Sequence, residues 1–220
     1  MEPVLVSLEA GVLSITLNRP EKANAMNEAM QNCLVEFLHK EKIKAVVLAA
    51  AGPKIFSAGA DLKEFSELER GVAARKRREL LKRTLDAVLG YPRPLIAAVQ
   101  GKALGAGAMV ALLADELAMA DTAELGLPEI KHGIPTPVGY AIVAARGGMP
   151  LARRMVQDGE SVGPGLADHV FDIESLKEKS IARARLLAAL PAEAYRVNKT
   201  FINAPLNAAL HAAFAAADRA

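Results

Sequence analysis

The chain has 220 residues, of which 52% are hydrophobic and 24% charged, a composition typical of a soluble globular protein of one or two domains. The 27 Lys and Arg residues nearly balance the 25 Asp and Glu residues, so the net charge of +2 disfavours a dedicated nucleic-acid-binding protein. Aromatic residues make up only 4%, without tryptophan, which disfavours a base-stacking surface. The single cysteine, Cys33, excludes an intramolecular disulfide, and no Cys/His spacing indicates a metal site.

The N-terminal segment has an acidic second residue and no basic region before its apolar run, so it does not resemble a secretory signal. The longest uncharged runs, residues 103–114 and 133–145, are shorter than the ~20 residues that cross a bilayer. We therefore expect a cytoplasmic protein without a membrane partner.

The first half of the chain alternates apolar strand patterns with helical ones. Residues 4–8 and 12–17 are β-branched, alternating runs that predict a hairpin. Asn27 is a predicted helix cap, for a short helix that extends to about His39. Residues 45–50 predict a buried strand, and residues 65–89 a charged helix that ends before the proline-rich residues 91–94.

The second half continues this alternation and then becomes helical. Residues 95–99, 116–120 and 123–127 predict short apolar strands, and the small-residue run 103–114 lies between the first two. Strands alternating with helices predict an α/β fold. From residue 174 onward the pattern is helical, with expected breaks near Pro191 and Pro205. We therefore expect a core of residues 1–172 and a helical C-terminal region of residues 173–220.

Two turns rich in glycine and alanine, residues 55–62 and 101–109, each follow a predicted strand and precede a predicted helix. Small residues allow a ligand to approach the backbone, and unpaired amides at a helix start favour negative charge. Two such turns can direct two N–H groups at one oxygen, as stabilisation of an enolate requires. The alternative is that these residues only permit tight packing of helix on sheet. Neither turn matches a phosphate-binding loop.

Glu129 lies between Pro128 and Ile130 in an otherwise mostly apolar stretch. A carboxylate in such surroundings tends to have a raised pKa and can serve as a general base or acid. The alternative is a surface turn in which Glu129 contacts Lys131.

In order and spacing, four blocks resemble the crotonase superfamily, the enoyl-CoA hydratase/isomerase family: residues 15–27 (ITLNRPEKANAMN), 45–65, 94–121 and 123–139 (AELGLPEIKHGIPTPVG). The resemblance implies a crotonase-like ββα spiral whose helical C-terminal region supports trimers or pairs of trimers. It also implies an acyl-CoA thioester as substrate, with coenzyme A part of the substrate and no separate cofactor. Its catalytic groups would be Glu129 and the N–H groups of Ala60 and Ala106. Its substrate-binding positions would be Lys22, Ala23, Ala25, Ala58, Asp61, Leu62 and Met109.

Hydratases of this family use two glutamates, and Met109 stands at the position of one of them. Glu116 is expected to lie ~10.5 Å farther along a helix from Met109, too far to substitute. The single remaining acid, Glu129, favours an enoyl-CoA isomerase, and the resemblance leaves two alternatives. One is carbon–carbon bond formation of the carboxymethylproline synthase type, and the other is a relative that binds acyl-CoA without catalysis.

Three further features have competing interpretations. Residues 159–163 match G-x-S-x-G, the nucleophile elbow of α/β-hydrolases, but lack its strand–turn–helix context. His132 and His169 are possible acid–base groups, although an isolated histidine is more often structural. The basic residues between 70 and 83 are interpreted as a solvated helix face, or as a surface that attracts the coenzyme A phosphates.

Overall fold

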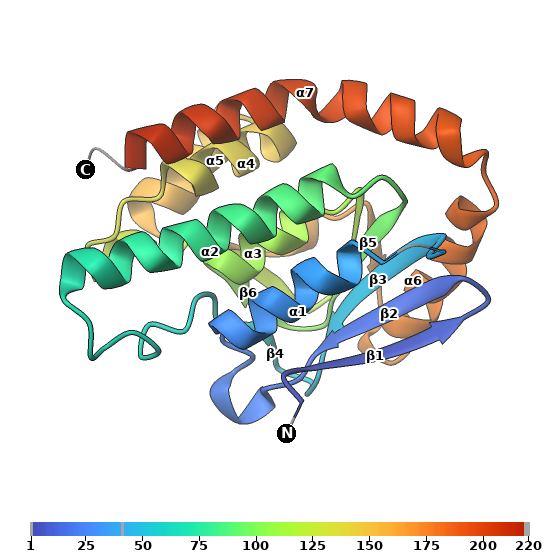
Figure 1. Cartoon of the computed structure of the whole chain (residues 1–220), viewed down its shortest axis with the longest axis horizontal. Helices are drawn as coiled ribbons and strands as arrows, with labels where there is room; N and C mark the ends of the chain where they lie inside the picture. The colour runs from blue at the N-terminus through green and yellow to red at the C-terminus, as the bar shows by residue number, and fades with distance from the viewer. Residues whose placement is uncertain (1, 41, 218–220) are drawn as a thin grey trace.

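The computed structural model describes residues 2–40 and 42–217, and these residues form two β-sheets surrounded by helices (Figure 1). The strands of the larger sheet are β1 (Val4–Glu9), β2 (Val12–Leu17), β3 (Ala45–Ala50), β5 (Leu95–Val99), β7 (Glu116–Ala120) and β10 (His169–Phe171), in that spatial order. The strands of the smaller sheet are β4 (Ile55–Ser57), β6 (Lys102–Leu104), β8 (Glu124–Gly126) and β9 (Ser161–Val162).

The first hairpin is confirmed. β1 and β2 pair antiparallel from Val4 opposite Leu17 to Glu9 opposite Val12. The two residues between them, Ala10 and Gly11, have φ of 51° and 83°. Positive φ at both central positions is the geometry of a tight two-residue hairpin turn.

The chain then passes repeatedly from the larger sheet to the smaller one and into a helix. β3 leads to β4 and α2 (Arg70–Gly90), β5 leads to β6 and α3 (Ala106–Leu112), and β7 leads to β8. Parallel pairing of β3, β5 and β7 in one sheet, and of β4, β6 and β8 in the other, stacks successive turns on each other. This arrangement confirms the predicted α/β class and the ββα spiral.

The N-terminal helix begins where the sequence predicts, whereas α2 begins later. α1 (Glu28–Leu38) is capped by Asn27, whose side chain accepts a hydrogen bond of 3.0 Å from the Met30 N–H. The prediction that the next helix begins at residue 65 is wrong, because α2 starts at Arg70 and Glu69 is still non-helical. Phe65 is buried within the preceding turns, so its apolar character reflects burial there.

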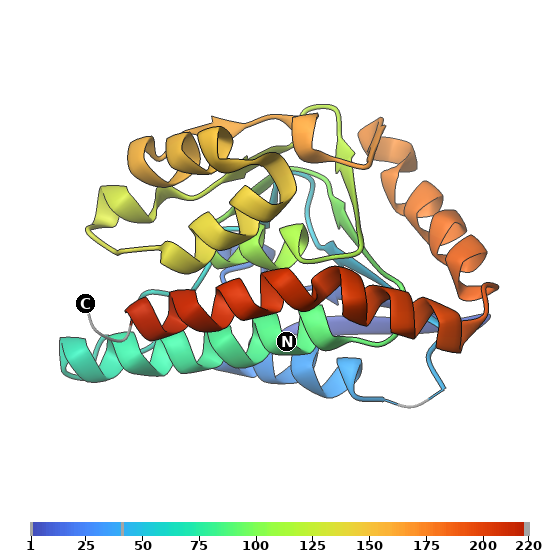
Figure 2. The same cartoon turned by 90° about the horizontal axis from the view of Figure 1, so that it is seen from above.

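The C-terminal half contributes α4 (Pro137–Gly147), α5 (Met149–Arg153), α6 (Ile173–Ala188) and α7 (Ala192–Ala217). α6 packs on strands of the larger sheet, and α7 runs along α4 and α2 in both views (Figures 1 and 2). The predicted break near Pro205 is wrong, because α7 continues through this residue. Its C-terminal part buries Leu210 and Phe214, and this packing offsets the hydrogen bond that proline cannot donate.

The division of the chain at residue 172 remains a prediction. Among the described residues, no helix has the length and apolar character needed to span a membrane.

Gly101 marks a close crossing of two backbone segments. A β-carbon at this position would lie 2.1 Å from the Lys54 carbonyl oxygen. The same carbonyl accepts the Lys102 N–H at 3.0 Å, so the crossing is part of the pairing between β4 and β6.

Gly101→Ala is therefore expected to lower the free energy of unfolding by about 3 kcal/mol, at the upper end of the range for overpacking. Gly90→Ala is the matched control, because a β-carbon there meets nothing within 4 Å. Denaturant unfolding measures both variants. Equal stability of the two would contradict the close crossing.

A buried ion pair joins α7 to the end of the α3 segment. Lys199 Nζ lies 2.8 Å from Asp115 Oδ2, and their side chains are only 7% and 14% exposed. Asp115 also accepts the Leu95 N–H at 2.8 Å, and Lys199 donates to the Arg93 carbonyl at 3.3 Å. Burial lowers the pKa of Lys199 and raises that of Asp115, and their mutual attraction opposes both effects.

Removing one partner leaves the other charge buried, so Lys199→Met is expected to cost about 3–5 kcal/mol of unfolding free energy. Lys102→Met removes a comparable but solvent-exposed pair with Glu124, and is expected to cost less than about 1 kcal/mol. Thermal and urea unfolding compare the two variants. A loss for Lys199→Met no larger than for Lys102→Met would refute a stabilising role for the buried pair.

Candidate functional site

The two glycine/alanine turns predicted from the sequence contact each other through their backbones. Gly59 has φ of +94°, and a β-carbon there would lie 2.9 Å from the Leu104 carbonyl oxygen and 3.3 Å from the Ala106 nitrogen. At Gly105, with φ of +52°, a β-carbon would lie 3.1 Å from Glu129 Oε1 and 3.8 Å from the Gly59 α-carbon. Both positions need glycine, for their left-handed backbone and for lack of space.

This contact brings the amides of Ala60 and Ala106 into one region. Ala106 is the first residue of α3, and the N–H groups of a first helical turn have no partner within the helix. Within the described part of the chain, neither the Ala60 nor the Ala106 N–H donates a hydrogen bond. Two unused donors therefore lie on adjoining turns.

Glu129 lies in the short 3₁₀ helix η2 (Pro128–His132), beside the second turn. Its Oε1 would be 3.1 Å from a β-carbon at Gly105. Its Oε2 is buried and finds no hydrogen-bond partner among the described residues. Burial raises the pKa of the carboxyl group, opposed only by a backbone hydrogen bond at Glu129 itself. The group is thus a proton acceptor of increased basicity next to two free amides.

Lys131 does not neutralise Glu129. Its Nζ donates a hydrogen bond of 2.9 Å to the Gly159 carbonyl instead, so the interpretation of Glu129 as a surface turn in contact with Lys131 is wrong.

Met109 occupies the next turn of α3 and is 3% exposed. A β-carbon at Gly139 would lie 3.1 Å from its Cε and 2.9 Å from Leu127 Cδ1, so its tip packs between α4 and the residues that precede Glu129. A thioether cannot transfer protons. Met109 therefore contributes apolar surface beside Gly139 and Leu127.

The prediction that Glu116 lies farther along the helix of Met109 is wrong, because α3 ends at Leu112 and Glu116 begins β7. Its carboxylate accepts hydrogen bonds from Arg183, the shortest 2.6 Å, and contacts His169 Nε2 at 3.0 Å. Burial alone would raise its pKa, but the hydrogen bonds from Arg183 and His169 lower it below the ordinary value. Glu116 is thus held by a salt bridge to Arg183 and a contact with the His169 ring. His132 is exposed in η2.

The segments predicted to hold the substrate lie against each other. The Ala58 N–H donates to the Ala23 carbonyl at 2.9 Å, which joins the loop of Lys22, Ala23 and Ala25 to the first turn. Lys22, Ala58 and Leu62 are exposed beside this junction. Asp61 is paired: its Oδ2 lies 3.0 Å from Arg19 Nη1.

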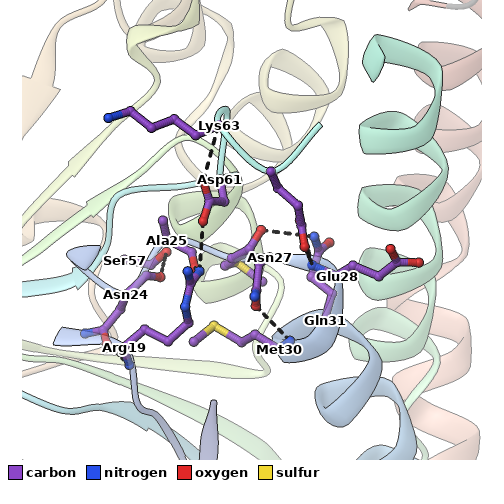
Figure 3. Close-up of polar contacts among 12 residues, drawn as sticks. Arg19, Asn24, Ala25, Asn27, Glu28, Met30, Gln31, Ser57, Asp61 and Lys63 are labelled. Atoms are coloured by element: carbon purple, nitrogen blue, oxygen red, sulfur yellow. Dashed lines mark hydrogen bonds and ion pairs between the residues drawn. The ribbon is translucent and has the colours of Figure 1, made fainter. Parts of the chain in front are cut away.

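Sequence reasoning missed the polar network that supports these loops (Figure 3). Asn24 is fully buried in a left-handed conformation, and its side-chain amide donates to the carbonyls of Ala51 and Ile55 at 2.9 and 3.0 Å. The buried Ser57 hydroxyl donates to the Asn24 carbonyl at 2.9 Å. The sequence signal for this network is the polar run of residues 18–24, between the predicted hairpin and the helix capped by Asn27.

The structure contradicts the hydrolase interpretation and favours the solvated-face interpretation of the basic helix. The G-x-S-x-G match follows a π-helical turn, η3 (Arg154–Asp158), and leads into a 3₁₀ turn, so the strand–turn–helix of a nucleophile elbow is absent from these described residues. In α2, Lys76 pairs with Glu28 and Lys82 with Asp86. These pairs favour the interpretation as a solvated helix face.

Comparison with known proteins agrees with this arrangement. A family model described as enoyl-CoA hydratase/isomerase matches residues 7–220. The 2,3-dehydroadipyl-CoA hydratase of Escherichia coli K12 is 34% identical over 98% of this chain and 87% of its own. Carboxymethylproline synthase of Pectobacterium carotovorum subsp. carotovorum is 32% identical over 87% of this chain and 80% of its own. The crystal structure of an enoyl-CoA hydratase from Bacillus anthracis superposes with a TM-score of 0.85 at 29% identity, covering 96% of this chain and 86% of that one.

Because Oε2 of Glu129 is buried without a hydrogen-bond partner, we expect the ionised carboxylate to destabilise the folded protein. Because its pKa is higher in the folded state, this cost is fully present above that pKa and disappears below the unfolded value of about 4.3. Glu129→Gln is therefore expected to melt at a higher temperature than the wild type at pH 7, and the difference is expected to vanish near pH 4. Glu124→Gln, which alters an exposed pair, is the control. A Glu129→Gln variant that melts lower at pH 7 would contradict the unpaired state of Oε2.

Proposed function

Because the chain belongs to the enoyl-CoA hydratase/isomerase family, and its members act on acyl-CoA thioesters, we propose that it moves the double bond of an enoyl-CoA with Glu129 as the single proton-transfer group. The observation that carries this proposal is one carboxylate with a buried, unpartnered oxygen beside two free backbone amides. Such a site can form an enolate and return its proton, and it needs no second acid.

The proposed reaction starts with a 3-enoyl thioester whose carbonyl oxygen accepts hydrogen bonds from the Ala60 and Ala106 N–H groups. The Glu129 carboxylate removes a proton from C2, and the electron pair of that C–H bond spreads over C4 and the thioester oxygen. Glu129 then returns the proton to C4, giving the 2-enoyl thioester. Each of the two amide donors is expected to lower the barrier by about 3–4 kcal/mol.

The remaining predicted residues would hold the rest of the substrate. Lys22, Ala23, Ala25, Ala58 and Leu62 line the junction of two loops, where adenine and pantetheine would lie. Asp61 would contribute its backbone there, since its carboxylate is bonded to Arg19. Met109 would form a wall of the acyl pocket. Assembly as a homotrimer or a hexamer and a cytoplasmic location remain predictions.

Hydration is disfavoured, because adding water across a double bond needs one group to activate water and another to deliver the α-proton. Carbon–carbon bond formation is the second candidate. It is supported by the 32% identity to carboxymethylproline synthase and by the same single-acid arrangement. In that case an electrophile other than a proton would capture the enolate.

Proton exchange tests the proposal directly. The protein is incubated in deuterated buffer with saturated and 3-enoyl-CoA esters, and deuterium uptake and the double-bond shift are followed by mass spectrometry and absorbance. We expect uptake and isomerisation by the wild type, and a loss of 10²- to 10⁴-fold, roughly, in Glu129→Gln.

Glu124→Gln controls for the substitution itself and is expected to retain full activity. Binding of the esters without any exchange would refute catalysis and identify a non-catalytic acyl-CoA-binding relative. Exchange without a double-bond shift would favour carbon–carbon bond formation.

Hydration of a short 2-enoyl-CoA is a separate prediction. The wild type is expected to form 3-hydroxyacyl-CoA at least ~10²-fold more slowly than it isomerises, because Met109 supplies no proton. Chromatography of the thioester products measures both rates. Equal rates of hydration and isomerisation would show that this protein hydrates the double bond without a second carboxylate. That result would overturn the argument that a single acid restricts it to isomerisation.

A further inference from the structure

We infer that Arg19 is a positioning residue for the reaction, because it holds the peptide that presents the Ala60 N–H. This inference rests on the proposed function, in which that N–H binds the thioester oxygen. The role assigned to Arg19 requires no contact with the thioester. It acts through Ala25 and Asp61.

The direction of the Ala60 N–H is determined by the other end of its peptide group. Gly59 C=O and Ala60 N–H belong to the same planar peptide, so fixing the carbonyl fixes the N–H in the opposite direction. The Gly59 carbonyl accepts the Met26 N–H at 2.8 Å, and the Asp61 N–H donates to the Met26 carbonyl at 3.2 Å. Met26 thus holds the chain on both sides of Ala60 and leaves the Ala60 N–H unused.

Arg19 connects the two segments that make this bridge. Its Nη1 donates at 2.7 Å to the carbonyl of Ala25, next to Met26, and at 3.0 Å to Oδ2 of Asp61, next to Ala60 (Figure 3). The single Nη1 atom therefore bonds to both of the segments that the isolated Met26–Ala60 bridge joins.

Arg19 is itself held in place by its own loop. Its N–H donates to Asn24 Oδ1 at 2.9 Å, and its carbonyl accepts the Asn24 N–H at 2.8 Å. Because Asn24 is fully buried, the base of the arginine side chain is anchored in the protein core.

The Arg19–Asp61 pair is largely shielded from solvent, so it can hold the two segments in place. The side chains of Arg19 and Asp61 are 18% and 17% exposed, so water and salt screen the pair less than an exposed one. The interaction is a charge-assisted hydrogen bond, of the stronger class. A lysine at this position keeps the charge but replaces the planar guanidinium with a flexible point charge. It is expected to restore the function only in part.

The experiment compares Arg19→Met, Arg19→Lys and the wild type, with Arg154→Met as control. Arg154 forms an exposed pair with Glu160 that lies outside these two loops. Proton exchange gives kcat and KM, and thermal unfolding gives the folded fraction. The probe for the amides is acetoacetyl-CoA, whose bound enolate is followed by its near-ultraviolet absorbance as a function of pH.

We expect Arg19→Met to lower kcat at least tenfold while the protein remains folded, and to shift enolate formation from acetoacetyl-CoA to higher pH. Arg19→Lys is expected to recover part of both losses, and Arg154→Met neither to lower kcat nor to shift the enolate.

Two results would overturn the inference in different ways. If the wild type forms the enolate and exchanges protons, and folded Arg19→Met does so equally well, Arg19 has only a structural role. If the wild type neither exchanges protons nor forms the enolate, the proposed function fails and the positioning role fails with it.

Discussion

The site depends on the direct backbone contact between the turns at Gly59 and Gly105. Two successive turns of a ββα spiral can bring their strand-to-helix junctions this close only if no side chain lies between them. Gly107 also has no space for a side chain, because a β-carbon there would lie 2.5 Å from Ser57 Cβ. The spacing of the sheets, the start of α3 and the placing of two free amides therefore follow from one packing requirement.

The fold meets this requirement with unusually small side chains. β3 and β5 are buried along their length and rich in alanine, which keeps neighbouring layers close. Glu129 is the exception to an otherwise apolar environment. Its unpartnered Oε2 is expected to cost stability, and the proposed chemistry needs the raised basicity that the same burial gives the carboxylate. Stability and reactivity are therefore in opposition at this residue.

Local patterns predicted local structure well. The hairpin around Ala10 and the cap at Asn27 are determined by neighbours in the sequence, and both are present as expected. The break at Pro205 was wrongly predicted because packing of α7 on distant helices outweighs one missing hydrogen bond. Local pattern also indicated Glu129 and the two glycine/alanine turns, whereas the sheet topology and the choice of Ala60 and Ala106 as donors came only from the family resemblance. The Arg19–Asp61 and Asp115–Lys199 pairs could not be predicted from the sequence, because each joins residues far apart in the chain that only the tertiary fold brings together.

The pairing of Asp115 with Lys199 also has a consequence for the order in which the protein is made. The strands that surround Asp115 leave the ribosome well before the residues of α7 do. During synthesis the nascent core must therefore keep this carboxylate hydrated or protonated, and its burial becomes favourable only when Lys199 arrives. Completion of the core around Asp115 is thus tied to the docking of α7, whose Lys199 is synthesised 84 residues after Asp115.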